Sequence, residues 1–274
     1  MSKYEVDYMN LVDRVLQEGE DRETRAGPTR ACFGTMLVIN SLEDGRFPIL
    51  TTRRMRPDGV WGELAAFVRG ATMLREFKMW GCNYWDKNAA AWPPNQGREA
   101  MDMSVGKIYG AQWRDFNGHD QLKALVQGIK ENPGSRRHLL TTYNPAKVQL
   151  GCLPPCHLLA QFNVTNHGWL ECVVTMRSVD LILGLPSDIV LYATLLALIA
   201  KECNYEPGYI TFMMGDTHVY KNHVALWKKQ NLHTPLDLPE YVLAKDASLL
   251  YFVPSDMELT DYQHQESLPY VLNA

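Results

Sequence analysis

Apolar residues recur three and four positions apart in three stretches of the chain, and this spacing places them on one face of an α-helix. In the second stretch Glu63 lies among apolar neighbours, and the third is terminated by Asn132, Pro133 and Gly134. The predicted helices cover residues 4–15, 60–68 and 122–129.

After residue 138 the pattern becomes typical of strands. Residues 158–165 and 169–176 are apolar or alternate with polar residues, and the turn formers at 166–168 predict a hairpin between them. Residues 209–214 predict another strand, which the chain leaves at Gly215.

The longest apolar run, residues 189–200, predicts a buried helix capped by Ser187 or Asp188. Charge and proline content predict a loop over residues 20–30 and an exposed insertion over residues 88–98. No repeat or long linker divides the chain. We therefore expect a single α+β domain over residues 1–274, with a mostly antiparallel mixed sheet packed by helices.

Composition disfavours several classes of protein. The net charge of −4 argues against a surface that coats nucleic acid, so phosphate binding would need a local arginine cluster. The N-terminus lacks the apolar core of a signal peptide, and the run 189–200 is shorter than the roughly 20 residues that span a bilayer. We expect a cytoplasmic protein without membrane contact.

The six cysteines are expected to be reduced thiols, as in most cytosolic proteins of this size. Cys152 and Cys156 could suggest zinc, but a second ligand pair at suitable spacing is missing. No metal is therefore expected.

Cys156, followed by His157, is the best candidate for a nucleophile. The thiolate is the reactive form, and nearby positive charge is needed to lower the pKa of the thiol. Neighbouring strand residues point to opposite faces, so the Cys-His pair alone is also compatible with simple packing.

Arginines at element boundaries could supply that charge and bind an anion. Their forked guanidinium groups match a phosphate dianion, and the Ser178 hydroxyl would add a donor. The alternative for the adjacent pair is a solvated surface. The candidates are Arg25, Arg136, Arg137 and Arg177.

Other polar residues could move protons or hold a sugar. Burial of Glu63 would raise its pKa and suit proton transfer through water, although a helix-surface carboxylate fits the same pattern. Tyr109, His218 and Tyr220 supply hydroxyl and imidazole groups, and His218 could equally be a core histidine. The absence of a glycine-rich nucleotide loop disfavours dinucleotide and P-loop chemistry.

Taken in order, these motifs resemble the thymidylate synthase family along nearly the whole chain. The resemblance implies that family's fold and an obligate homodimer formed through the sheet, in which Arg136 and Arg137 reach the partner's site. The matching segments are residues 47–53, 84–86, 109–114, 132–137, 155–157, 177–180 and 215–220.

The resemblance also implies roles for individual residues. A nucleotide phosphate would meet Arg25, Arg177 and Ser178, and the sugar would meet His218 and Tyr220. The implied folate-binding residues are Tyr84, Trp85, Asp180, Leu183 and Gly184. The implied catalytic residues are Cys156, His157, Glu63, Tyr109 and Asp188.

The implied chemistry begins when the Cys156 thiolate adds to C6 of a pyrimidine nucleotide. C5 then takes a one-carbon unit from the co-substrate 5,10-methylenetetrahydrofolate. Glu63 and Tyr109 would organise the water that removes the C5 proton.

Asp188 stands where the family has asparagine, and this departure favours dCMP over dUMP. A carboxylate accepts from the N4 amino group of cytosine and stabilises a proton on N3, whereas uracil O4 would face it with another acceptor. Met176, where the family usually has glutamine, makes the chain similar to bacteriophage deoxycytidylate hydroxymethylases. If phage-encoded, the protein would act in the host cytoplasm.

The product depends on whether water can reach the one-carbon unit after its transfer to C5. Asn88 and Ser187 replace large aromatic residues of the family, which favours attack by water, whereas Trp85 and the tail 267–274 favour a closed site. We expect 5-hydroxymethyl-dCMP, with 5-methyl-dCMP as the alternative product. Turnover of dUMP or CMP, and a non-catalytic nucleotide binder, are weaker alternatives, because a binder needs no nucleophile.

Overall fold

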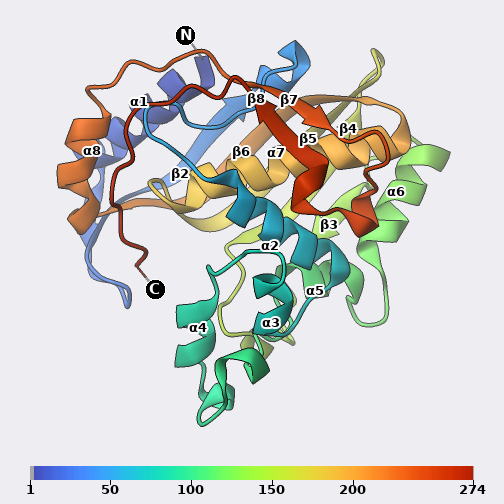
Figure 1. Cartoon of the computed structure of the whole chain (residues 1–274), viewed down its shortest axis with the longest axis horizontal. Coiled ribbons are helices and arrows are strands. Elements are labelled where there is room, and N and C mark those ends of the chain that lie inside the picture. Colours follow the sequence, from blue (N-terminus) through green and yellow to red (C-terminus); the bar gives the residue numbers. More distant parts are fainter. Residues whose placement is uncertain (1–2, 274) are drawn as a thin grey trace.

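The computed structural model describes residues 3–273 and is built around a six-stranded mixed sheet (Figure 1). Its strand order is β1-β2-β6-β5-β4-β3; β5 and β6 run parallel, and all other neighbours are antiparallel. The predicted α+β class with a mostly antiparallel sheet is confirmed. The strands are β1 Glu20–Arg22, β2 Thr29–Ile39, β3 Leu139–Thr141, β4 His157–Val164, β5 Trp169–Asp180 and β6 Glu206–Tyr220, with β7 Glu240–Leu243 and β8 Met257–Thr260 paired separately.

Successive side chains of each strand point to opposite faces of the sheet. The pairing register joins five strands, so residues on one face line up in rows across the sheet. One row of paired positions is buried under the helices, and the rows on either side of it face outward. The buried row is Leu37, Phe212, Val174, Ala160 and Leu140. The outward rows are Val38, Thr211, Val173, Gln161 and Leu139, and Met36, Met213, Thr175, Leu159 and Thr141.

The long helix α7 packs against β5 and β6, and α1 packs against β2 (Figure 1). Helix α2 contacts α7, which brings Glu63 towards the start of that helix. The helices are α1 Lys3–Glu18, α2 Pro57–Arg69, α3 Leu74–Lys78, α4 Asp86–Ala91, α5 Tyr109–Arg114, α6 Gln121–Glu131, α7 Gly184–Cys203 and α8 Val224–Gln230.

The elements with strong periodicity lie where the sequence predicted them. Helix α1 ends before Gly19, whose N–H donates to Val15 O at 3.0 Å. Helix α6 is capped by the Asp120 carboxylate, which accepts from the backbone N–H of Lys123 at 3.1 Å. In the β4–β5 hairpin, Gly168 adopts a φ of 84°, in the left-handed region that glycine tolerates best.

Three expectations about boundaries are wrong. The segment 20–30 is not a loop throughout, because β1 pairs with the start of β2 across a short turn. Strand β6 continues past Gly215 to Tyr220, because β2 and β5 both pair with it there. Helix α7 begins at Gly184, so Ser187 and Asp188 lie inside its first turns and do not cap it; Pro186 is tolerated that near a helix start.

Two further expectations need correction. The segment 88–98 is exposed in part, but Asn95 is buried and its side chain bonds Ala89 O, Ser104 O and Ser104 N–H, so the projecting α4 region is anchored (Figure 1). Helix α7 extends well beyond the run 189–200, and by length and composition it could cross a membrane. Most of its apolar window (78%) is buried within the fold, as in a core helix. All six cysteines are free thiols.

Candidate active site

Cys156 lies immediately before β4, where two anchors hold its backbone and side chain. Its N–H donates to the Tyr109 hydroxyl at 2.8 Å, and its carbonyl accepts from Arg177 N–H at 2.8 Å. The Arg177 guanidinium donates to the carbonyls of Pro154 and Pro155, both at 2.7 Å, and its Nη2 lies 3.7 Å from Cys156 Sγ. The structure therefore brings Cys156, Tyr109 and Arg177 together.

The groups around Cys156 shift the pKa of its thiol in opposite directions. Burial raises its pKa above the ordinary value, and Asp188 raises it further whenever that carboxyl group is ionised, whereas Arg177 and a hydrogen bond with Tyr109 lower it. A thiolate would need more positive charge than one guanidinium supplies. This deficit is consistent with a site that additional arginines complete.

His157 points away from the nucleophile, as expected for adjacent strand residues. Its ring is buried, stacks on Tyr109 at a centroid distance of 4.1 Å, and places Nδ1 2.8 Å from the Tyr192 hydroxyl. Burial lowers the pKa of His157 to about 3. The imidazole is therefore neutral at pH 7, and no contact makes it a base for Cys156.

Two carboxyl groups with few hydrogen-bond donors face the same region. Glu63 Oε1 accepts from Trp85 Nε1 at 2.8 Å, and burial raises the pKa of Glu63 to about 7 despite that bond. Burial also raises the pKa of Asp188 well above its ordinary value, and the charge of Glu63 raises it further. Glu63 is thus suited to take up and release protons near neutral pH, and the raised pKa of Asp188 favours the protonated form of that carboxyl group.

The end of β6 carries a second group of polar side chains. His218 Nδ1 lies 2.8 Å from Asp216 Oδ1, and Arg22 Nη1 donates to Asp216 Oδ2 at 2.7 Å. The hydrogen bond from His218 lowers the pKa of Asp216, and Arg22 adds to that effect. Sequence reasoning missed Arg22 as a member of this network, because Asp216, its ion-pair partner, is 194 residues away in the sequence.

Tyr220 connects this group to the nucleophile. Burial raises its pKa, the charges of Asp180 and Cys156 raise it further, and Arg25 lowers it, so these residues are electrostatic neighbours. Asp180 ends β5, where its Oδ1 accepts from Ile182 N–H at 2.9 Å beside Leu183 and Gly184 at the start of α7. Ser178 lies on the same strand, opposite Asp216.

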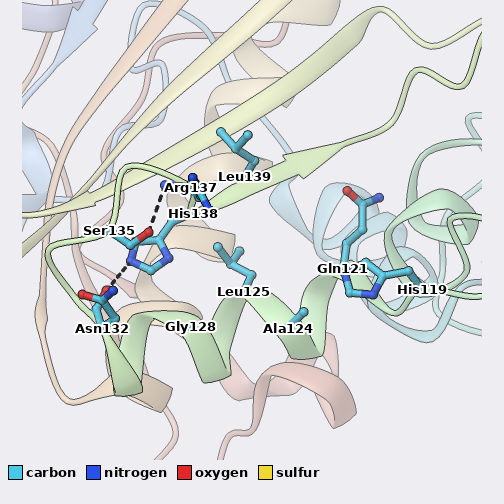
Figure 2. A pocket seen from close by; sticks show the side chains of 10 residues that line it. All are labelled: His119, Gln121, Ala124, Leu125, Gly128, Asn132, Ser135, Arg137, His138 and Leu139. Atoms are coloured by element: carbon cyan, nitrogen blue, oxygen red, sulfur yellow. Dashed lines mark hydrogen bonds between the residues drawn. The ribbon is translucent and has the colours of Figure 1, made fainter.

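Arg136 and Arg137 are the predicted site residues that the single chain does not bring to Cys156. Both side chains are exposed in the loop before β3, and the Arg136 carbonyl accepts from Gln161 Nε2 at 3.4 Å. Arg137 borders a cavity of about 350 Å³ above α6. Figure 2 shows Arg137 beside His138 and Ser135 at one end of the cavity, with His119 and Gln121 at the other.

The cofactor candidates surround Glu63. Trp85 is buried with its indole N–H on Glu63, and Tyr84, which is 39% exposed, presents an open ring near the same carboxylate. The accessible aromatic ring of Tyr84 and the half-buried carboxyl group of Asp180 fit a flat, hydrogen-bonding ring system such as a pterin. Within residues 3–273, no cluster of His, Cys, Asp and Glu could hold a metal ion.

Comparisons with known proteins show the family of this chain. A family model described as thymidylate synthase matches residues 6–273. The chain is 33% identical over 280 residues to a thymidylate synthase of Mesoplasma florum, covering 93% of this chain and 95% of that protein. It is 36% identical over 252 residues to a probable thymidylate synthase of Escherichia phage T5, covering 88% of each.

A bifunctional dihydrofolate reductase-thymidylate synthase of Leishmania major is 38% identical over 280 residues. That alignment covers 93% of this chain, which spans about half the length (52%) of the bifunctional relative. From the family match over nearly all its residues, and the full-length similarity to single-function relatives, the chain belongs to the thymidylate synthase family.

Proposed function

We propose that this protein transfers a one-carbon unit from 5,10-methylenetetrahydrofolate to C5 of dCMP and releases 5-hydroxymethyl-dCMP. The family relationship supports folate-dependent one-carbon transfer to a pyrimidine nucleotide. The observation that carries the choice of base is Asp188, a half-buried carboxyl group that shares the site with Cys156 and Glu63.

In the first step, Cys156 sulfur forms a bond to C6 and an electron pair moves into the ring. Arg177, 3.7 Å from the sulfur, favours the thiolate that adds. Asp188 then receives the polarised edge of the base. Its neutral acid form donates to unprotonated N3 of cytosine, and its other oxygen accepts from the N4 amino group.

The later steps need one proton acceptor and one water. 5,10-Methylenetetrahydrofolate supplies the one-carbon unit, which becomes bonded to C5. Glu63, with a pKa of about 7, takes the C5 proton through water. Tetrahydrofolate would leave with a proton on its amine nitrogen, and water would add a hydroxyl group to the exocyclic carbon and release its other proton to solvent. The Cys156 sulfur then departs from C6 as the thiolate, and the C5–C6 double bond re-forms.

The alternative product is 5-methyl-dCMP with dihydrofolate, which requires hydride transfer in place of water addition. Ser187 is half-buried at the start of α7, where its hydroxyl donates to Leu183 O at 2.9 Å. Asn88 is half-buried on α4. Two small polar side chains close to the proposed folate position favour water there. Hydride transfer needs tight stacking, and a misplacement of roughly 1 Å can cost about a hundredfold in rate.

We also propose a homodimer formed through the outward face of the sheet. This face is broadly apolar, and Met36, Met213 and Leu139 are 60%, 49% and 43% exposed. An apolar surface of this kind on a sheet is expected to be covered. Arg136 is attached to its edge through Gln161, so a second copy packed there would receive both arginines near its own Cys156. That addition would supply the positive charge that the thiol lacks.

The substrate and product are tested by incubating the protein with dCMP or dUMP labelled with tritium at C5. We expect faster tritium release from dCMP and a mass corresponding to hydroxymethyl-dCMP, without the absorbance change of dihydrofolate. Asp188→Asn should shift the preference towards dUMP by roughly a hundredfold, since an amide suits uracil. Faster release by the wild type from dUMP would contradict the choice of dCMP.

The shared site is tested by subunit mixing. Cys156→Ser and Arg136→Ala homodimers should each be inactive, because each lacks one group in both sites. After equal mixing and exchange, about a quarter of all sites should recover both groups, because half the dimers are mixed and each contains one complete site. No recovery after exchange confirmed by native mass spectrometry would show a self-contained site.

A further inference from the structure

Helix α7 places two polar side chains on opposite sides of the His157 ring. Asp188 and Tyr192 are four residues apart, so they project from the same helix face. The Tyr192 hydroxyl lies 2.8 Å from Nδ1, and Asp188 Oδ1 lies 3.9 Å from Nε2. Stacking on Tyr109 holds the plane of the ring. The imidazole therefore lies between a buried phenol and the carboxyl group proposed to face the base.

The position of the single ring hydrogen follows from the phenol. A neutral imidazole has one N–H, on either Nδ1 or Nε2. Burial keeps His157 neutral by lowering its pKa, and it keeps Tyr192 protonated by raising the pKa of the phenol. Among the described residues, Nδ1 is the sole hydrogen-bond partner of the Tyr192 hydroxyl. A hydrogen on Nδ1 would leave the buried phenol proton without an acceptor, so the phenol donates to Nδ1 and the ring hydrogen is on Nε2.

We propose that Tyr192 is a positioning residue that determines base specificity by fixing, through His157, which oxygen of Asp188 carries the proton. This inference rests on the proposed function, in which Asp188 faces the nucleobase. Oδ1 is the carboxyl oxygen that lies 3.9 Å from Nε2, so a hydrogen on Nε2 favours Oδ1 as the acceptor and leaves the proton on Oδ2. At 3.9 Å the pair is too long for a direct hydrogen bond, so a small side-chain rotation or a bridging water completes the contact.

A fixed proton matters because a free one would remove the selectivity of Asp188. Uracil presents a donor at N3 and an acceptor at O4, whereas cytosine presents an acceptor at N3 and a donor at N4. A carboxylic acid that exchanged its proton between both oxygens could pair with either base. An acid that always donates from Oδ2 to N3 and always accepts from N4 at Oδ1 pairs fully with cytosine. Against uracil the same acid leaves unmatched polar groups at N3 and O4.

The experiment compares Tyr192→Phe with the matched variant Tyr8→Phe in the full-length protein. Tyr8 is equally buried and its hydroxyl donates to Leu181 O at 2.9 Å, so both changes remove one buried phenol hydrogen bond. We expect Tyr192→Phe to reduce the ratio of kcat/KM for dCMP to that for dUMP by about tenfold. Tyr8→Phe should leave this ratio unchanged. Nitrogen-15 NMR of His157 should show hydrogen on Nε2 in the wild type and a mixture of tautomers in Tyr192→Phe.

The results of these experiments test the role of Tyr192 separately from the proposed substrate. Equal losses on both nucleotides in Tyr192→Phe would reduce Tyr192 to a structural residue and overturn the proposal. Hydrogen on Nδ1 in the wild type would also overturn it, and that measurement holds even if Tyr192→Phe fails to fold. A wild-type preference for dUMP would contradict the proposed function alone, because the tautomer and the change in ratio would still test Tyr192.

Discussion

Glu5 and Glu63 are both glutamates set among apolar helix neighbours, but their surroundings are opposite. Glu5, on α1, accepts four hydrogen bonds of 2.7–2.8 Å from the N–H and hydroxyl groups of Thr51 and Thr52. Glu63, on α2, accepts one, from Trp85. Further bonds reach the Thr51 and Thr52 hydroxyls from Leu236 N–H and the Gln230 amide, so the Glu5 region is a closed network.

The number of hydrogen-bond donors distinguishes a carboxyl group that stabilises the fold from one that can exchange protons in a reaction. A buried carboxylate with four donors has its charge compensated, and it joins the N-terminal helix to a loop nearly fifty residues away. The half-buried carboxyl group of Glu63, with one donor, lacks that compensation, so its pKa moves to about 7. Asp188 follows the second pattern. Under-compensated acids near a thiol therefore indicate the reaction region, and the saturated acid indicates scaffold.

The largest expected effect belongs to the reaction region. Cys156→Ser should reduce C5 tritium release by at least roughly ten-thousandfold, because a serine hydroxyl is a far weaker nucleophile than a thiolate. Nucleotide binding, measured by calorimetry, and the thermal midpoint should remain close to wild type. Substantial activity in this variant would return Cys156 to the group of packing thiols.

The scaffold region should show the reverse. Glu5→Gln replaces an acceptor oxygen with an amide N–H that faces other donors, and it should cost about 3–4 kcal/mol of unfolding free energy. The kcat of the remaining folded protein should stay near wild type. Urea unfolding and activity measured well below the midpoint check both parts. A normal stability would mean that the four hydrogen bonds around Glu5 contribute little net free energy.

Periodicity predicted the parts of the fold that depend on local sequence. Helices α1, α2 and α6 and the β4–β5 hairpin match because their apolar spacing and turn residues act within a few positions. The second half of β6 was missed because partner strands sustain it through Gly215. The start of α7 was missed because Gly184 and Pro186 read as a turn, although a first helical turn tolerates both.

The site residues also divide into those that local sequence could predict and those that depend on contacts across the fold. Cys156, Tyr109, Arg177, Asp188 and Glu63 were all named from sequence, and the fold brings them into one region. Arg22 and Tyr192 were missed, because their importance comes from contacts across the fold to Asp216 and His157. Only the spacing of four between Asp188 and Tyr192 on a predicted helix could have indicated the second contact.

The smallest expected effect concerns the pH dependence of stability at Glu63. In the unfolded chain this side chain loses its proton near its ordinary pKa of 4.5, whereas in the folded protein it keeps the proton to about pH 7. Between these values the Glu63 side chain binds fewer protons in the unfolded chain, so its contribution to the unfolding free energy falls as pH rises and levels off above pH 7.

Glu63→Gln removes this loss while keeping an oxygen that can accept from Trp85. The variant should therefore be more stable than the wild type by about 2 kcal/mol at pH 8, a value reduced for the partial exposure of Glu63, and nearly equal to it at pH 4.5. Urea unfolding of both proteins at the two pH values measures the difference, with Asp7→Asn on the exposed face of α1 as a control that should show little change. A stability difference that does not change with pH would mean that Glu63 is compensated like Glu5, and the distinction between the two regions would fail.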